Sequence, residues 1–156
     1  MTAPLIISSL FVLAVVILCF LKPNAGRIFL GFFFLIMAFG VNGTFILTNP
    51  QGYVDYLGTS LLPLYRDLSR VTVALNPVPY GVLLMLFEIA MGLLILSRQR
   101  YIKIGLIGTM IFVIGLAPVS IMQIPWLGLL VGQGYLLSKE FDQTFLELVF
   151  RKKAVA

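Results

Sequence analysis

Long apolar runs, separated by short polar or charged gaps, are the feature of this chain that most limits its fold. The runs cover residues 4–21, 28–48, 78–96 and 104–137. A helix needs about 20 residues to cross the hydrocarbon core of a bilayer. The first three runs fit one crossing each. The fourth is too long for one crossing at about 1.5 Å rise per residue, so we expect it to fold back on itself.

The composition indicates that lipid, not water, surrounds the protein. Of the 156 residues, 60% are hydrophobic and only 11% are charged, whereas soluble domains average about 25% charged residues. So few charges cannot cover a water-exposed surface. We therefore predict an all-α, multi-pass integral protein of a cell membrane, folded as a single domain over residues 1–156.

We expect a bundle of about five transmembrane helices, with the fifth formed by the folding back of the last run. Two breaks are open, Ala117-Pro118 and Gln123-Ile124-Pro125-Trp126, since both carry helix-breaking residues. The first is favoured because the second leaves a short last helix; Pro125 then kinks the fifth helix. The expected helices cover residues 4–21, 28–48, 78–96, 101–116 and 119–137.

The basic residues predict the orientation of these helices. With the N-terminus outside, the inner segments hold most of the Lys and Arg, as the positive-inside rule requires, and only Arg66 and Arg70 fall outside. The C-terminus is then cytoplasmic. Because the bases lie in gaps between apolar runs, not on one solvated face, we expect no nucleic acid partner. The inner bases are Lys22, Arg27, Arg98, Arg100, Lys103, Lys139, Arg151, Lys152 and Lys153.

Two polar segments have amphipathic character. Residues 49–77, predicted to be extracytoplasmic, carry leucines at helical spacing together with tyrosines, which predicts a surface-lying helix broken by Pro63. Residues 138–156 form the predicted cytoplasmic tail, in which 141–150 alternates apolar and acidic residues and predicts a short amphipathic helix. The first run is expected to be a retained helix, since no basic residue precedes it as in a signal peptide.

Glu88, near the middle of the third run, is the leading candidate for a functional residue, because an ionisable group inside a bilayer costs several kcal/mol unless it is neutral, paired or hydrated. We hypothesise that Glu88 faces the bundle interior and relays a proton or holds a polar ligand. The alternative is a purely structural role, in which a protonated Glu88 donates one hydrogen bond to a neighbouring helix. Candidate partners of Glu88 are Asn42, Tyr80, Gln123 and Gln133.

Small residues mark places where helices could approach closely. Gly128 and Gly132 form a small-xxx-small pattern, which we interpret as packing inside the bundle in preference to dimerisation. Gly40 and Gly43 form a second such group in the outer half of the second run.

The central part of the chain carries the segments Arg27-Ile28-Phe29-Leu30-Gly31, Pro50-Gln51-Gly52-Tyr53, Tyr56-Leu57 and Phe87-Glu88-Ile89-Ala90-Met91-Gly92-Leu93-Leu94. In these segments the chain, over about residues 27–137, resembles the DoxX-like family of small membrane proteins. The resemblance implies a four-helix core, to which residues 4–21 add an N-terminal helix, and a role as a membrane subunit or assembly partner, in some relatives of quinone-linked or redox complexes. A lysine common in the family after its first helix is replaced by Val41-Asn42-Gly43, so no role tied to it carries over.

The residues favour a noncatalytic function. The chain lacks histidine and has one cysteine, so we expect no metal site and no cofactor held by this chain alone. No phosphate-binding loop or catalytic triad pattern is present, and no catalytic residue is predicted. We expect an accessory, assembly or anchoring subunit with a membrane protein partner or a homo-oligomer. The alternatives are a subunit that contributes a quinone or lipophilic-ligand pocket to a redox complex, and a small proton-coupled transporter.

Overall fold

The computed structural model describes residues 3–151, and these residues form helices and connecting turns without a β-strand. This confirms the predicted all-α class. Lys152 and Lys153 of the predicted inner tail lie outside the described residues. The elements are α1 (Ala3–Leu21), α2 (Pro23–Ile36), the π-helix η1 (Met37–Gly43), α3 (Thr44–Thr48), α4 (Gly52–Gly58), α5 (Pro63–Val71), η2 (Val73–Leu75), α6 (Pro77–Leu96), α7 (Arg100–Leu116), η3 (Ala117–Val119), η4 (Ile121–Gly128), α8 (Leu129–Leu137) and α9 (Phe145–Arg151).

Four helical segments of the described chain are long and apolar enough to cross a membrane: Ala3–Leu21, Pro23–Thr48, Pro77–Leu96 and Arg100–Val119. The second joins α2, η1 and α3 into one continuous rod. These segments overlap the first four predicted crossings. Ile121–Leu137 is a shorter apolar helical segment.

Three helices begin with a proline, at Pro23, Pro63 and Pro77. Proline suits the first helical position, since its missing N–H would have no intrahelical partner there. Pro63 separates α4 from α5, as predicted for the outer segment. The polar gap between the first two apolar runs is mostly helical, because only Lys22 is non-helical and α2 begins at Pro23.

The end of the fourth apolar run also differs from the prediction. The α-helix ends at Leu116, the chain continues as a 3₁₀ helix to Val119, and it becomes extended at Ser120. However, residues 119–137 are not one kinked α-helix, because Ile121–Gly128 is a 3₁₀ helix and only Leu129–Leu137 is α-helical. Pro125 explains the difference, since it lacks an N–H and its ring crowds the preceding turn, which disfavours a regular α-helix there.

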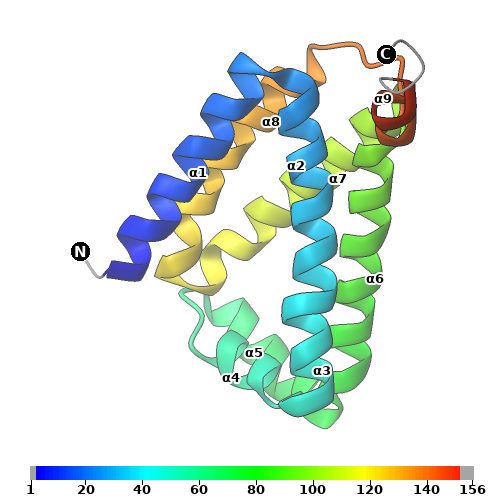
Figure 1. Cartoon of the computed structure of the whole chain (residues 1–156). Coiled ribbons are helices and arrows are strands. Elements are labelled where there is room, and N and C mark those ends of the chain that lie inside the picture. The colour runs from blue at the N-terminus through cyan, green and yellow to red at the C-terminus, as the bar shows by residue number, and fades with distance from the viewer. Residues whose placement is uncertain (1–2, 152–156) are drawn as a thin grey trace.

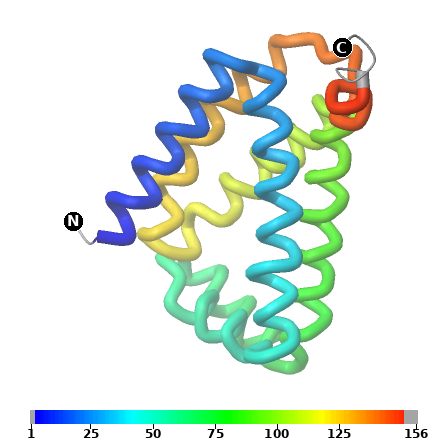
Figure 2. Tube along the Cα trace, viewed as in Figure 1, coloured from blue at the N-terminus to red at the C-terminus, as the bar shows by residue number. Residues whose placement is uncertain are grey.

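The bundle consists of two helix pairs bridged by α7 (Figures 1 and 2). Helix α1 packs along α8 and η4, α2 packs along α6, and α7 contacts both α6 and α8. The short helices α4 and α5 lie at the end where α3 stops and α6 starts, while α9 lies at the opposite end (Figure 1).

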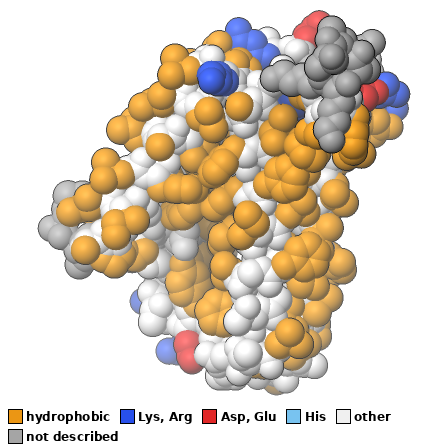
Figure 3. All heavy atoms as spheres, in the orientation of Figure 1, with side chains coloured by type: hydrophobic (Ala, Val, Ile, Leu, Met, Phe, Trp, Pro, Cys, Tyr) orange, Lys and Arg blue, Asp and Glu red, His pale blue; other side chains and the backbone are white. Residues whose placement is uncertain are grey.

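Much of the outer surface is hydrophobic (Figure 3). Large apolar side chains on all the long helices are exposed, including Leu10, Ile36, Leu83 and Ile111. Contiguous exposed apolar surface of this kind is unusual for a soluble monomer and is typical of a lipid-facing bundle. The buried core is smaller and joins side chains from α1, α2, α6, α7 and α8.

Arg27 connects three segments at one end of the bundle: α2, the end of α6 and the segment before α9. Its side chain is fully buried, and its guanidinium donates to the backbone oxygens of Ile95 (3.4 Å), Ser97 (3.0 Å) and Gln143 (2.5 Å). The first two oxygens belong to the C-terminal end of α6, where a cation is favourable because of the helix dipole. The third lies in the segment before α9. Arg27 therefore holds that segment against the bundle. In the sequence, Arg27 is one of the basic residues that indicate orientation.

Candidate functional site

The candidate site begins with a π-helical segment in the middle of the second apolar rod. Residues Met37–Gly43 are wound as a π-helix between two α-helical stretches. Such segments are rare and frequently lie at functional sites. Only Ala38 and Asn42 of this segment are buried, so the segment turns one polar side chain, that of Asn42, into the bundle.

Asn42 contacts the predicted acid directly. Glu88, on α6, is 2% exposed, and its Oε2 accepts a hydrogen bond of 2.6 Å from Asn42 Nδ2. Oε1 of Glu88 receives no hydrogen bond from the described residues. The structure thus brings together two of the five predicted site residues. It also leaves one carboxyl oxygen available to another group.

Tyr53 of α4 completes a chain of three polar side chains. Its hydroxyl donates to Oδ1 of Asn42 (2.9 Å) and lies 3.2 Å from the Asn42 carbonyl oxygen. Burial, and then the electrostatic influence of Glu88, raises the pKa of Tyr53 to about 12, so the phenol remains a donor at neutral pH. Gly81 makes this position possible, because a Cβ there would lie 2.6 Å from the Tyr53 ring.

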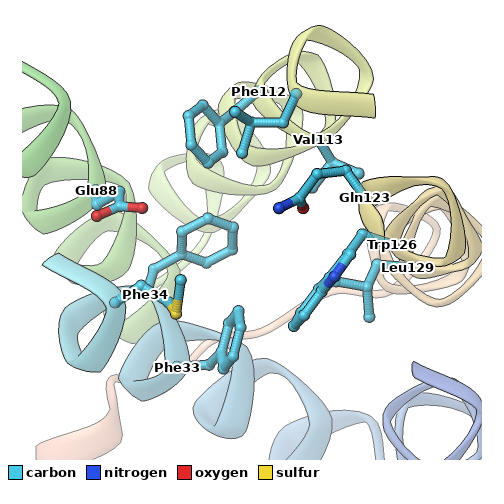
Figure 4. Close-up of a pocket in the computed structure, with 10 residues that line it drawn as sticks. Phe33, Phe34, Glu88, Phe112, Val113, Gln123, Trp126 and Leu129 are labelled. Atoms are coloured by element: carbon cyan, nitrogen blue, oxygen red, sulfur yellow. The ribbon is translucent and has the colours of Figure 1, made fainter. Parts of the chain in front are cut away.

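A cavity of about 100 Å³ lies beside Glu88, between α2, α6, α7 and η4 (Figure 4). Its walls are mainly aromatic: Phe33 stacks on Trp126 with ring centroids 5.4 Å apart, and Phe34 and Phe112 meet edge to face at 6.2 Å. The lining residues are Phe33, Phe34, Met37, Glu88, Phe112, Val113, Leu116, Gln123, Trp126 and Leu129.

Gln123 is a second polar group at the cavity. Its side chain extends from η4 toward the cavity in Figure 4, and its Nε2 donates to the hydroxyl of Tyr56. Tyr56 and Tyr53 both belong to α4, so this short helix contacts Gln123 at the cavity and also Asn42, the partner of Glu88. An apolar pocket with a few convergent polar groups is the usual form of a small-molecule site.

Two predicted partners of Glu88 lie elsewhere. Tyr80 is 40% exposed near the start of α6 and does not line the cavity. Gln133 is fully buried, but its Nε2 donates to Thr109 Oγ1 (3.1 Å), between α8 and α7. The sequence could not separate these residues from Asn42 and Gln123, because the direction in which each side chain points depends on helix rotation.

Of the four glycines predicted to mark close helix contacts, some lie against another helix and one does not. A Cβ on Gly128 would lie 2.8 Å from Val12, and one on Gly132 would lie 3.2 Å from the Cys19 sulfur, so both let α1 and α8 approach within the chain. A Cβ on Gly43 would lie 4.0 Å from the sulfur of Met85 on α6, which is an ordinary van der Waals contact. Gly40 is exposed and has only Ile36 of its own rod within 4 Å. Gly40 therefore packs against no other helix among the described residues.

Several site residues were not singled out from the sequence. Tyr53 is one of several tyrosines in the polar segment 49–77, and the cavity aromatics Phe33, Phe34, Phe112 and Trp126 are ordinary members of long apolar runs. A glycine at position 81, where a tyrosine must lie against α6, leaves no recognisable pattern in a glycine-rich membrane sequence. No known sequence pattern predicts the π-helical winding of Met37–Gly43 either.

Comparisons with protein-family models, with curated proteins and with solved structures found no match to this chain. Among the described residues, no group of three or more His, Cys, Asp and Glu side chains lies close enough together to hold a metal ion.

Proposed function

We propose that this chain is a multi-pass membrane protein that binds a lipophilic molecule, with the hydrogen-bonding head group of that molecule seated beside Glu88. The observation that carries the proposal is the position of the Glu88 carboxyl at an aromatic cavity, with Asn42 engaging one oxygen and the other left without a partner. An intramembrane acid that faces the bundle interior is expected to serve a function.

The length of the last apolar segment supports five crossings. A 3₁₀ helix rises about 2.0 Å per residue and an α-helix about 1.5 Å. Eight 3₁₀ residues in η4 and nine α-helical residues in α8 together reach about 30 Å, the thickness of a bilayer core. Residues 121–137 thus reach the length of a crossing with fewer residues, because the 3₁₀ helix rises further per residue than an α-helix.

The basic residues support an N-terminus outside and a cytoplasmic C-terminus. Lys22, Arg27, Arg98 and Lys139 all lie at the end of the bundle where α1, α6 and α8 stop. This end would face the cytoplasm by the positive-inside rule. Helices α4 and α5 would then lie on the outer side of the membrane.

The size and walls of the cavity favour a ligand with a single ring. Its volume of about 100 Å³ is comparable to the engineered apolar cavity of about 150 Å³ that binds benzene. Aromatic walls suit a planar ring, and a carboxyl and an amide suit polar ring substituents. A quinone head group has this chemistry, and an apolar tail would extend from the cavity into lipid.

Within the membrane the protein would act as an accessory subunit that contributes this pocket to a larger complex. The resemblance to the DoxX-like family suggests the same role, and we propose membership of that family on the same residues. A redox reaction would require a partner that carries the electron-transferring group, because this chain has no histidine and a single cysteine.

Purification in a mild detergent followed by native mass spectrometry tests the proposal. We expect the wild type to carry a lipophilic molecule of defined mass. Leu116→Phe, which fills the cavity, should lose it, whereas Ile114→Phe, an exposed position on the same helix, should retain it. A wild type without a bound molecule, or equal binding in both variants, would refute the pocket. A copurifying membrane protein would support the subunit role separately.

A further inference from the structure

Helix α5 carries an exposed apolar stripe that the ligand pocket does not explain. Leu64, Leu68 and Val71 are 72%, 45% and 67% exposed. Their spacing of four and three residues places all three on one side of the helix. We refer to these three residues as the α5 stripe.

A neighbouring side of α5 is anchored to the rest of the protein, so the α5 stripe cannot rotate inward. Tyr65 donates from its hydroxyl to the backbone oxygen of Gly115 (2.7 Å), at the end of α7, and Ser69 donates to that of Val54 (2.8 Å), in α4. Ser69 is buried. These two anchors fix the face of α5 that packs on the protein, so the exposure of the α5 stripe is a property of the fold.

The charged residues of α5 occupy a third side. With about 100° of rotation per residue, the α5 stripe lies roughly 100° to one side of the two anchors, and Arg66 and Arg70 lie roughly 100° to the other. Asp67 lies between the basic and apolar sides. One side of α5 therefore packs on protein, one is apolar and one is charged.

Exposed apolar side chains continue along the chain from the α5 stripe into α6. Leu75, in η2, is 83% exposed, and Val78 and Leu83 on α6 are 38% and 64% exposed. Helix α6 is one of the segments long enough to cross a membrane. The apolar surface of α5 thus leads into a surface that faces lipid in the proposed topology.

We infer that α5 lies in the headgroup layer of the bilayer, with the α5 stripe against the acyl chains and Arg66 and Arg70 among the lipid phosphates. The three sides of α5 match the three surroundings at such a position, which are protein, hydrocarbon and the anionic or aqueous interface. A second protein would also cover the stripe, but it would not account for the basic side that faces away from it.

The single cysteine of the chain makes a depth measurement practical, because Cys19 is fully buried and should not react with a polar label. Leu68→Cys and the matched variant Arg66→Cys would each be labelled with the fluorophore NBD in the full chain and reconstituted in phosphatidylcholine vesicles. Both positions are exposed, so neither substitution removes core packing. Unsubstituted protein reports any background labelling of Cys19.

We expect the probe at position 68 to emit at shorter wavelength and to be quenched several-fold more by nitroxide-labelled phosphatidylcholine than the probe at position 66. Aqueous iodide should show the reverse order. Quenching of both probes by iodide alone would place α5 in water and overturn the inference. Shielding of the position 68 probe from both quenchers would also overturn it, by indicating a protein contact. Neither readout depends on a ligand, so the result is separate from the fate of the proposed pocket.

Discussion

Replacement of Asn42 by alanine tests the polar network on which the candidate site rests. The Asn42 side chain makes two hydrogen bonds, to Glu88 Oε2 at 2.6 Å and from the Tyr53 hydroxyl at 2.9 Å. Asn42→Ala removes both and leaves two polar groups without that partner. The expected result is a less stable bundle and a Glu88 side chain that is no longer held in one position.

The size of the effect follows from measurements on membrane proteins. Side-chain hydrogen bonds between membrane helices average about 0.6 kcal/mol and reach about 1.7 kcal/mol. Two bonds therefore predict a loss of about 1–3 kcal/mol in the free energy of unfolding for Asn42→Ala. Tyr53→Phe removes one of the two bonds and should cost about half as much.

Steric trapping in bicelles measures the free energy of unfolding of such proteins without harsh denaturants. Thr44→Val is the matched control, since the exposed Thr44 hydroxyl donates only to Gly40 of its own rod. The double variant Asn42→Ala with Tyr53→Phe should lose less stability than the sum of the two single variants, because the bond between Asn42 Oδ1 and the Tyr53 hydroxyl is lost only once. Equal stability of Asn42→Ala and Thr44→Val, or additive effects in the double variant, would refute the network.

Three further predictions concern packing, the tail and pH. Gly92→Ala should lower the free energy of unfolding by about 1–3 kcal/mol through overpacking, because the added Cβ would lie 2.9 Å from the backbone oxygen of Gly31 in α2. The control Gly134→Ala, with nothing within 4 Å of the added Cβ, should be neutral in the same unfolding assay. Arg27→Gln should expose residues 138–144 to limited proteolysis, because it removes the guanidinium bonds to α6 and to the tail, whereas Lys103→Gln at an exposed position should not. The pKa of Tyr53, raised from 10.0 to about 12, should leave stability constant below pH 10 and lower it between pH 10 and 12, since the unfolded state loses the proton first; an equal decrease in Tyr53→Phe would contradict this.

The sequence was sufficient to predict the helices because long apolar runs and their charged gaps report directly on solvent and element length. It predicted the break at Pro63 and the end of α7 at Leu116 for the same reason, since proline chemistry acts locally. It did not show that α2 begins inside the polar gap, because one non-helical residue, Lys22, is enough to separate α1 from α2. The 3₁₀ winding of residues 121–128 was missed because Pro125 was expected only to kink an α-helix.

The site was predicted in part. An acid in an apolar run is visible in any sequence, so Glu88 was found, but its partners depend on which way neighbouring helices are rotated. Asn42 faces Glu88 within a π-helical segment, whose position cannot be read from composition, whereas Tyr80 and Gln133 turn elsewhere. Tyr53 reaches the network only because a short helix in the polar segment folds back against Gly81 of α6.

The most direct test of the ligand pocket uses Trp126, which lines the cavity and is the only tryptophan in the chain. Its fluorescence would be followed in detergent while a short-tailed benzoquinone is added. Binding at the cavity predicts saturable quenching in the wild type and in Ile114→Phe, and weak, non-saturating quenching in Leu116→Phe. Quenching that rises linearly and equally in all three proteins would show that the probe has no site beside Glu88, and would contradict the proposed function.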